Sequence, residues 1–184
     1  MNLADLQNQL PAYAKDLRLN LESVLTEGGA PGLTSKQIAI IAMACAVASR
    51  YQPFTYAVTG FAAQHLNATE LDGARAAAAI MAMNNIYYRF THLVEDPEYG
   101  TLRANLRMSV IARPGIDKND FELACLAVSA INGCGACMSS HEKVARQHET
   151  GVQTIQSVVR IAAVIHAVAV TLEQTAAVSD ALAA

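Results

Sequence analysis

Apolar residues recur at spacings of three and four along nearly the whole chain, and no stretch alternates convincingly between apolar and polar residues. The first pattern is typical of an α-helix with a buried face, whereas alternation is typical of a half-buried β-strand. Alanine, the strongest helix former, is abundant in the same segments. The sequence therefore predicts an all-α protein with about eight helices and no sheet.

Helix start and stop signals divide the chain into segments. Short polar side chains that favour the N-cap position stand before three predicted helices: Thr34 and Ser35 before residues 36–50, Asn67 and Thr69 before 71–88, and Asp117 before 118–131. Asn132-Gly133 ends the third of these, and a new helix is expected to begin at Cys134. Gly151 precedes a last long helix, from Val152 to about Leu172.

The two halves of the chain resemble each other. At a shift of 85 residues Ile38 pairs with Leu123, and at a shift of 81 residues Ile80 pairs with Ile161. Two matches in the same order predict an internal duplication within one domain, residues 1–184. The first repeat spans about residues 33–92 and the second about 116–175. Only the second carries a cysteine pair, since Ser49 and Gln52 stand at the matching positions of the first.

Charge and hydropathy exclude some classes of partner. The net charge is -3 and Lys and Arg form no cluster, so no nucleic-acid partner is expected. Apolar stretches such as residues 38–48 are shorter than the roughly 18 residues of a membrane span, and the N-terminus does not resemble a secretory signal. We expect a cytoplasmic protein without a membrane partner. Because 53% of the residues are hydrophobic, one chain of this size is expected to hide its apolar surface partly in a homo-oligomer.

The sequence INGCGACMSSHEKVAR, residues 131–146, contains the most specific chemical pattern in the chain. Cys134 and Cys137 form a CxxC pair, and His141 follows Cys137 by one helical turn. The free N–H groups of a helix N-terminus and a neighbouring imidazole both favour a thiolate. This pattern is typical of a redox-active dithiol. Cys45 and Cys125, by contrast, lie in apolar segments and are interpreted as small buried hydrophobic residues.

A structural zinc site is the alternative interpretation of the CxxC pair. His141 and His148 are the only candidates for the two further ligands, their spacing is longer than usual, and no second CxxC pair exists. The dithiol interpretation is therefore favoured. Neither interpretation requires a tightly bound organic cofactor.

Glu122 is an acid at the start of an otherwise apolar helix. Acids are common in the first turn of a helix, where their negative charge interacts favourably with the helix dipole. A buried glutamate there would also orient His141 and accept or relay its proton, which is a general way to activate a thiol. Asn84, Asn85, Tyr87 and Tyr88 are further candidates for lining a substrate pocket, although such residues more often pack in a core or an interface.

Glu122, eleven residues, CxxC, three residues and His141 together resemble the signature of the alkyl hydroperoxidase D family, within the carboxymuconolactone-decarboxylase-like superfamily. The likeness also covers LPAYAKDLRLNLESV, AAAAIMAMNNIYYRF and LRMSVIARPGIDKNDFELA, and so extends over nearly the whole chain. It implies an all-α fold with a duplicated helical unit, assembled as a trimer. It also implies an antioxidant peroxidase that reduces organic hydroperoxides.

The resemblance assigns a role to each residue of the signature. Cys137 matches the peroxidatic cysteine, which becomes a sulfenic acid, and Cys134 matches the proton donor that resolves it into a disulfide. Glu122 and His141 match the proton relay. The implied reductant is dihydrolipoamide on a lipoylated acyltransferase of a 2-oxoacid dehydrogenase complex. The implied electron acceptor, besides peroxide, is a partner AhpC-type peroxiredoxin.

Two features of the sequence do not match the roles that the family resemblance assigns. Cys134 lies nearer the helix N-terminus, so the dipole favours its thiolate, whereas the family assigns peroxide attack to Cys137. Ala136 stands where the family commonly has a histidine, so direct peroxidase activity is expected to be weaker. The alternatives are a dithiol reductase that serves the peroxiredoxin, a decarboxylase of the same superfamily that acts without cysteine, and a zinc-binding structural module.

Overall fold

The computed structural model describes residues 2–183. That part of the chain forms nine α-helices and two short 3₁₀ helices, and it contains no strand. The α-helices are α1 Leu3–Gln7, α2 Lys15–Val24, α3 Ser35–Ser49, α4 Gln52–Ala62, α5 Ala68–Leu93, α6 Glu98–Thr101, α7 Lys118–Ile131, α8 Gly135–Gln147 and α9 Val152–Ala183. The predicted all-α fold is confirmed. The count exceeds the expected eight because α1 and α6 are very short.

The helix boundaries follow the capping residues of the sequence. The side chains of Thr34, Asn67 and Asp117 accept hydrogen bonds from backbone N–H groups at the starts of α3, α5 and α7, as predicted. The predicted end of the last helix was wrong, because α9 continues well past Leu172. The residues after Leu172 include neither glycine nor proline and are rich in alanine, so nothing stops the helix there.

Helices α3 and α7 form the centre of the fold. Residues 38–46 of α3 and 120–129 of α7 are buried without interruption. The two helices contact each other, and each also packs against α5 and α9. They are the pair whose sequences match at a shift of 85 residues, which is compatible with the predicted duplication. The duplication itself stays a prediction.

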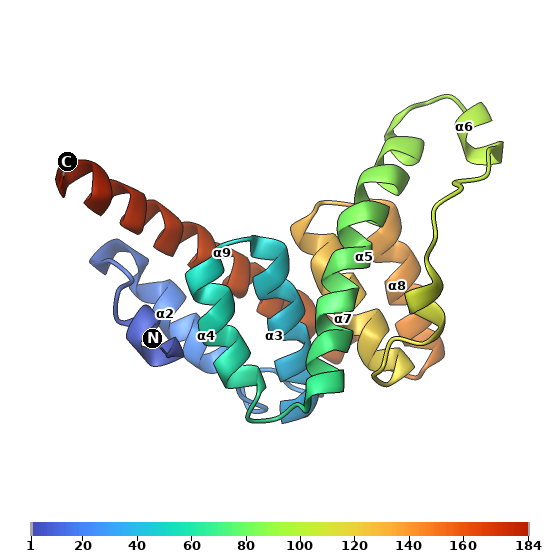
Figure 1. The fold of residues 1–184 in the computed structure, drawn as a ribbon. Helices are drawn as coiled ribbons and strands as arrows, with labels where there is room; N and C mark the ends of the chain where they lie inside the picture. The colour runs from blue at the N-terminus through green and yellow to red at the C-terminus, as the bar shows by residue number, and fades with distance from the viewer. Residues whose placement is uncertain (1, 184) are drawn as a thin grey trace.

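The second half of α5 extends beyond the helical body together with α6 (Figure 1). After α6 the chain returns through residues 102–108 and the 3₁₀ helix Ser109–Ala112. This return segment places Met108 and Ile111 beside residues of α5 and α8. It thereby closes one wall of the cavity described below.

Helix α9 contains a longer apolar stretch than the sequence analysis identified. Within the described residues, Val152–Val178 is the one helix long and apolar enough to cross a membrane, judged by length and composition alone. However, 44% of its most apolar window is buried inside the fold, and α9 packs against α2, α3 and α7. A core helix passes the same test. The absence of a membrane partner stays a prediction.

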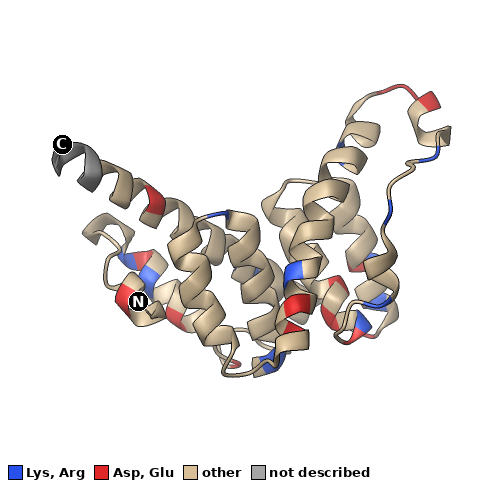
Figure 2. Ribbon diagram, viewed as in Figure 1, with Lys and Arg blue, Asp and Glu red and all other residues tan. Residues whose placement is uncertain are grey.

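Charged residues are scattered over the ribbon with both signs mixed (Figure 2). Two ion pairs lie near the first turns of α5, where Lys36 contacts Glu70 at 2.5 Å and Arg75 contacts Asp72 at 3.0 Å. This mixture is compatible with the expectation that no nucleic acid is a partner. The absence of such a partner also stays a prediction.

Gly73 of α5 permits the close approach of the segment that precedes α7. A Cβ atom there would lie 2.7 Å from Ile116 Cγ2 and 2.8 Å from the Pro114 carbonyl oxygen. We predict that Gly73→Ala lowers the free energy of unfolding by about 1–3 kcal/mol, because backbone must move to admit the methyl group.

Gly60→Ala in α4 is the matched control for this prediction, since apart from its chain neighbours and the adjacent backbone of α4 no atom lies within 4 Å of the position of its Cβ. That change is expected to stabilise the protein by up to about 1 kcal/mol, the usual helical preference for alanine. Urea unfolding of both variants measures the two effects. Stabilisation of similar size in both would show that the contact at Gly73 is unimportant.

Candidate active site

Cys134 occupies the N-cap of α8. Asn132 and Gly133 end α7, and Gly133 adopts a φ of 69°, which a glycine reaches without steric cost. The Cys134 sulfur accepts a hydrogen bond from the Cys137 backbone N–H at 3.3 Å, the bond that an N-cap serine or threonine usually accepts. The predicted helix break and restart are therefore confirmed. The sulfur of Cys134 lies where the partial positive charge of α8 is greatest.

Cys134 and Cys137 are joined in a disulfide, with their Cα atoms 5.3 Å apart. Cys134 is fully buried, whereas Cys137 is 6% exposed and lines a cavity. The two sulfurs therefore differ in access. A molecule in the cavity meets Cys137, and Cys134 lies behind it.

Glu122 and His141 form a buried pair that joins α7 to α8. His141 Nδ1 lies 2.6 Å from Glu122 Oε2, and their side chains are 15% and 8% exposed. A carboxylate accepts a hydrogen bond, so Nδ1 donates to it when Glu122 is ionised. The opposite ring nitrogen, Nε2, is then the one left for contacts in the cavity that His141 lines.

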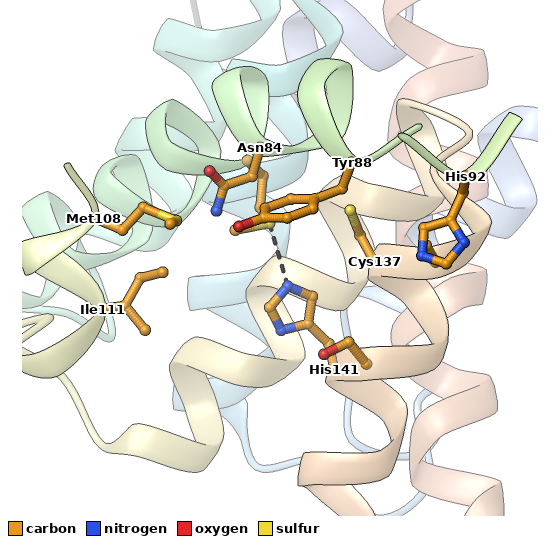
Figure 3. Close-up of a pocket in the computed structure, with 10 residues that line it drawn as sticks. Asn84, Tyr88, His92, Met108, Ile111, Cys137 and His141 are labelled. Carbon is orange, nitrogen blue, oxygen red and sulfur yellow. Dashed lines mark hydrogen bonds between the residues drawn. The ribbon is translucent and has the colours of Figure 1, made fainter. Parts of the chain in front are cut away.

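Met81 of α5 is the neighbour of this second nitrogen. Its sulfur lies 3.3 Å from His141 Nε2, the contact drawn as a dashed line in Figure 3. A thioether is only a weak acceptor and cannot donate. Met81 therefore makes at most a weak hydrogen bond with Nε2 and leaves this nitrogen available to a molecule in the cavity.

The cavity has a volume of about 350 Å³, within the range of small-molecule sites. Its walls come from α5, from the return segment and from α8 (Figure 3). They consist of Met81, Asn84, Tyr88 and His92 of α5, Met108 and Ile111 of the return segment, and Ala136, Cys137, Ser140 and His141 of α8. The cavity thus brings a sulfur atom, an imidazole and an apolar wall to one place.

Comparison with known proteins identifies the family. The model of the carboxymuconolactone decarboxylase family matches residues 97–180, the half that contains the disulfide. Proteins named alkyl hydroperoxide reductase AhpD match the whole chain. The one from Streptomyces griseus is 49% identical over 98% of this chain and 100% of its own length. The one from Bradyrhizobium sp. strain BTAi1 is 48% identical over 100% of this chain and 99% of its own. The chain belongs to the AhpD family.

Within this AhpD-family fold, the four residues of the sequence signature lie together. Glu122 pairs with His141, Cys137 lines the cavity with His141, and Cys134 is bonded to Cys137. Ala136 also lines the cavity, so the position that commonly holds a histidine contributes only a methyl group here. The chemical roles of the four residues stay predictions.

A polar network from α5 holds the turn before the disulfide. The Asn85 amide nitrogen donates to Ser129 Oγ at 2.9 Å, and the Asn132 amide nitrogen donates to Asn85 Oδ1 at 2.9 Å. Arg89 donates to the Asn132 carbonyl oxygen at 2.7 Å. These bonds fix the end of α7, and with it the position of Cys134.

Of the four pocket candidates identified on α5, two line the cavity and two do not. Asn84 and Tyr88 do, whereas Asn85 belongs to the polar network and Tyr87 lines a shallow apolar groove on the outer face of α5. Met81, Met108 and Ile111 were not identified by the sequence analysis. Isolated apolar residues are common everywhere, so only their position in space distinguishes them.

Cys45 and Cys125 are both buried free thiols, as predicted. Burial raises the pKa of both thiols well above the ordinary value, and the nearby Glu122 charge raises that of Cys125 further. They therefore remain neutral and unreactive. Within the described residues no three His, Cys, Asp or Glu side chains are placed to hold a metal ion, so the zinc interpretation gains no support.

The pair Glu122–His141 is expected to control the reactivity of the reduced dithiol. We predict that His141→Ala slows alkylation of Cys137 by iodoacetamide about tenfold or more, because the variant lacks the imidazole that can accept the thiol proton. Glu122→Gln should slow it less, since an amide retains a hydrogen bond to the ring without its charge. Rates would be read for each cysteine by mass spectrometry after reduction.

His148→Ala is the control, because His148 lies exposed at the end of the same helix. It should leave the alkylation rate unchanged. Equal rates in wild type and His141→Ala would show that the imidazole does not act on the dithiol.

Proposed function

We propose that this protein reduces alkyl hydroperoxides through a cycle between the Cys134–Cys137 dithiol and its disulfide. One observation carries the proposal. A cysteine of a redox pair and a histidine held by a buried carboxylate line the same cavity, in a chain of the AhpD family. The names of the relatives give the substrate class.

The first step takes place at Cys137, because its sulfur is the one that reaches the cavity. The Cys137 thiolate attacks the terminal oxygen of ROOH, the O–O bond breaks, and a sulfenic acid forms. The departing alkoxide takes a proton and leaves as ROH. His141 Nε2 supplies that proton, and Glu122 holds the ring through Nδ1.

The second step closes the disulfide. The Cys134 thiolate attacks the sulfur of the Cys137 sulfenic acid and, with one proton, releases water. The N-cap position of Cys134 supports its thiolate, because the Cys137 backbone N–H donates to the sulfur. The sum is two thiols and ROOH giving a disulfide, ROH and water. The dipole argument and the family assignment are thus compatible, since each cysteine performs a different step.

The reductant in this proposal is dihydrolipoamide, borne by a lipoylated acyltransferase of a 2-oxoacid dehydrogenase complex. Family resemblance supports this choice. A dithiol on a flexible arm would attack the more accessible sulfur, Cys137, through the open side of the cavity. The protein would act in the cytoplasm and would also pass electrons to an AhpC-type peroxiredoxin.

Ala136 favours a second candidate function, that of an electron carrier for the peroxiredoxin with little direct peroxidase activity. The residue leaves α8 without the additional imidazole common in the family. However, His92 of α5 lines the same cavity (Figure 3). The cavity therefore contains two imidazole side chains, and we retain the peroxidase as the first proposal.

We predict steady NADH oxidation when the purified protein is supplied with cumene hydroperoxide, lipoamide, lipoamide dehydrogenase and NADH. Cys137→Ser and Cys134→Ser should each abolish it, because either change prevents disulfide formation. Cys45→Ser, in a buried thiol outside the site, is the control and should remain active. A disulfide that lipoamide reduces but no peroxide re-forms would establish the electron carrier instead.

We further propose that the protein is a homo-oligomer, and the family resemblance indicates a trimer. The outer face of α5 exposes Ile86, Phe90 and Leu93, and a groove lined by Met83, Tyr87 and Leu106 continues it. Such contiguous apolar side chains are typical of a protein interface.

Phe90→Glu, combined with Ile86→Glu, is expected to yield monomers because two charges would be buried without partners. Light scattering after size-exclusion chromatography measures the mass. Leu19→Glu on α2, whose side chain is about as exposed as that of Phe90, should leave the assembly intact. A wild-type protein that is already monomeric would contradict the proposal.

A further inference from the structure

Asn84 is a buried polar side chain that makes no hydrogen bond within the part of the chain that the structure describes. It is 5% exposed, and its Oδ1 atom is shielded from solvent without a donor. The side chain lines the cavity beside Cys137 and His141 (Figure 3). Buried polar atoms of native proteins almost always have a partner, and an exception requires an explanation.

The next residue on α5, Asn85, has a side-chain amide that finds hydrogen-bond partners within the fold. Asn85 is of the same type and lies on the same helix, and its amide bonds to Ser129, Asn132 and the Met81 sulfur. The Asn85 amide thus makes hydrogen bonds within the fold, whereas the Asn84 amide lines the cavity without one. An unused buried amide destabilises the folded protein, which is typical of a group retained for function.

We propose that the Asn84 side-chain amide binds the peroxide group of the substrate, an inference that rests on the function proposed above. A hydroperoxide has one O–H donor and two acceptor oxygens, and a primary amide has both an acceptor and donors. Oδ1 is shielded in the structure, so the amide turns toward the cavity before the terminal O–H of ROOH donates to this oxygen. The Asn84 Nδ2 group is then available to donate to a peroxide oxygen. The torsion that turns the amide is soft, so its two ends adjust to the ligand.

This hydrogen bond places the terminal oxygen for the reaction. Cys137 attacks that oxygen, the O–O bond breaks, and the oxygen leaves with its hydrogen as the sulfenic acid of Cys137. The alkoxide oxygen takes the proton of His141 Nε2, which only the weak acceptor Met81 holds. Three side chains of the cavity thus each act on a different atom: the Cys137 sulfur on the terminal oxygen, the His141 imidazole on the alkoxide oxygen, and the Asn84 amide on the hydroxyl hydrogen.

The apolar wall of the cavity would contact the organic group of the hydroperoxide. Met108 and Ile111 of the return segment face the cavity together with Tyr88 (Figure 3). An alkyl or aryl group bonded to the peroxide would lie against them, while the peroxide itself lies between Asn84 and Cys137. Hydrogen peroxide fits the amide but not this wall, so organic hydroperoxides of the size of cumene hydroperoxide are the class that fits the whole cavity.

The test separates the two half-reactions in Asn84→Leu and Asn84→Ala. Reduced protein is mixed with cumene hydroperoxide, and the loss of free thiols gives the oxidation rate constant. We expect this constant to fall about tenfold, the value of one hydrogen bond to the substrate. Reduction of the disulfide by dihydrolipoamide needs no peroxide binding and should change less than twofold.

Thermal unfolding of the same variants distinguishes binding from a structural role. Asn84→Leu should have an unchanged Tm or one higher by about 2–4 °C, because it removes an unsatisfied buried polar group. Asn85→Leu is the matched comparison and should lower Tm, since Ser129 and Asn132 lose their partner.

Three outcomes would overturn the inference, and they are distinguishable. Unchanged oxidation in both Asn84 variants refutes the role of the amide and leaves the proposed function intact. Slower oxidation together with slower reduction and a lower Tm would show that Asn84 has a structural role and does not bind the peroxide. A wild-type dithiol that no hydroperoxide oxidises would refute the proposed function as well.

Discussion

The carboxyl group of Glu122 is buried on the most enclosed helix of the fold, and its need for a partner constrains everything around it. A buried carboxyl group without a hydrogen-bond partner is costly, and here the imidazole of His141 lies 2.6 Å from it. That contact links α8 to α7, two helices that also pack against each other. Cys137 is one turn from His141 on the same helix, so in the proposed function the carboxyl group on α7 orients an imidazole beside the reactive thiol.

Local features of the sequence were sufficient to predict the helices and part of the site. The caps at Thr34, Asn67 and Asp117 depend on a few neighbouring residues, and the relation between Cys137 and His141 depends only on helical spacing. The contact between Glu122 and His141 was foreseen from the chemistry that a thiol needs and from family resemblance. Spacing alone does not give it, because the two residues lie on different helices.

The other residues that line the cavity could not be predicted from local sequence patterns. Met81 belongs to a helix separated by many residues from the dithiol, and Met108 and Ile111 belong to a segment without regular periodicity. Asn84 and Asn85 are the same residue type at adjacent positions. Only the three-dimensional structure shows that Asn85 holds a turn and that Asn84 faces the cavity. The end of α9 was missed for a different reason, since helix termination requires a signal and the sequence there contains none.

The N-cap of α8 is a cysteine rather than the usual serine or threonine, and this gives the helix an unusual property. The atom that accepts a hydrogen bond from the Cys137 backbone N–H is also one of the two sulfurs of the disulfide. Reduction of the disulfide to a Cys134 thiolate, as in the proposed function, would therefore change the charge of a capping group and the stability of the first turn of α8. Amide hydrogen exchange at Cys137 would report the oxidation state of the protein, because its protecting hydrogen bond ends on the redox-active sulfur itself.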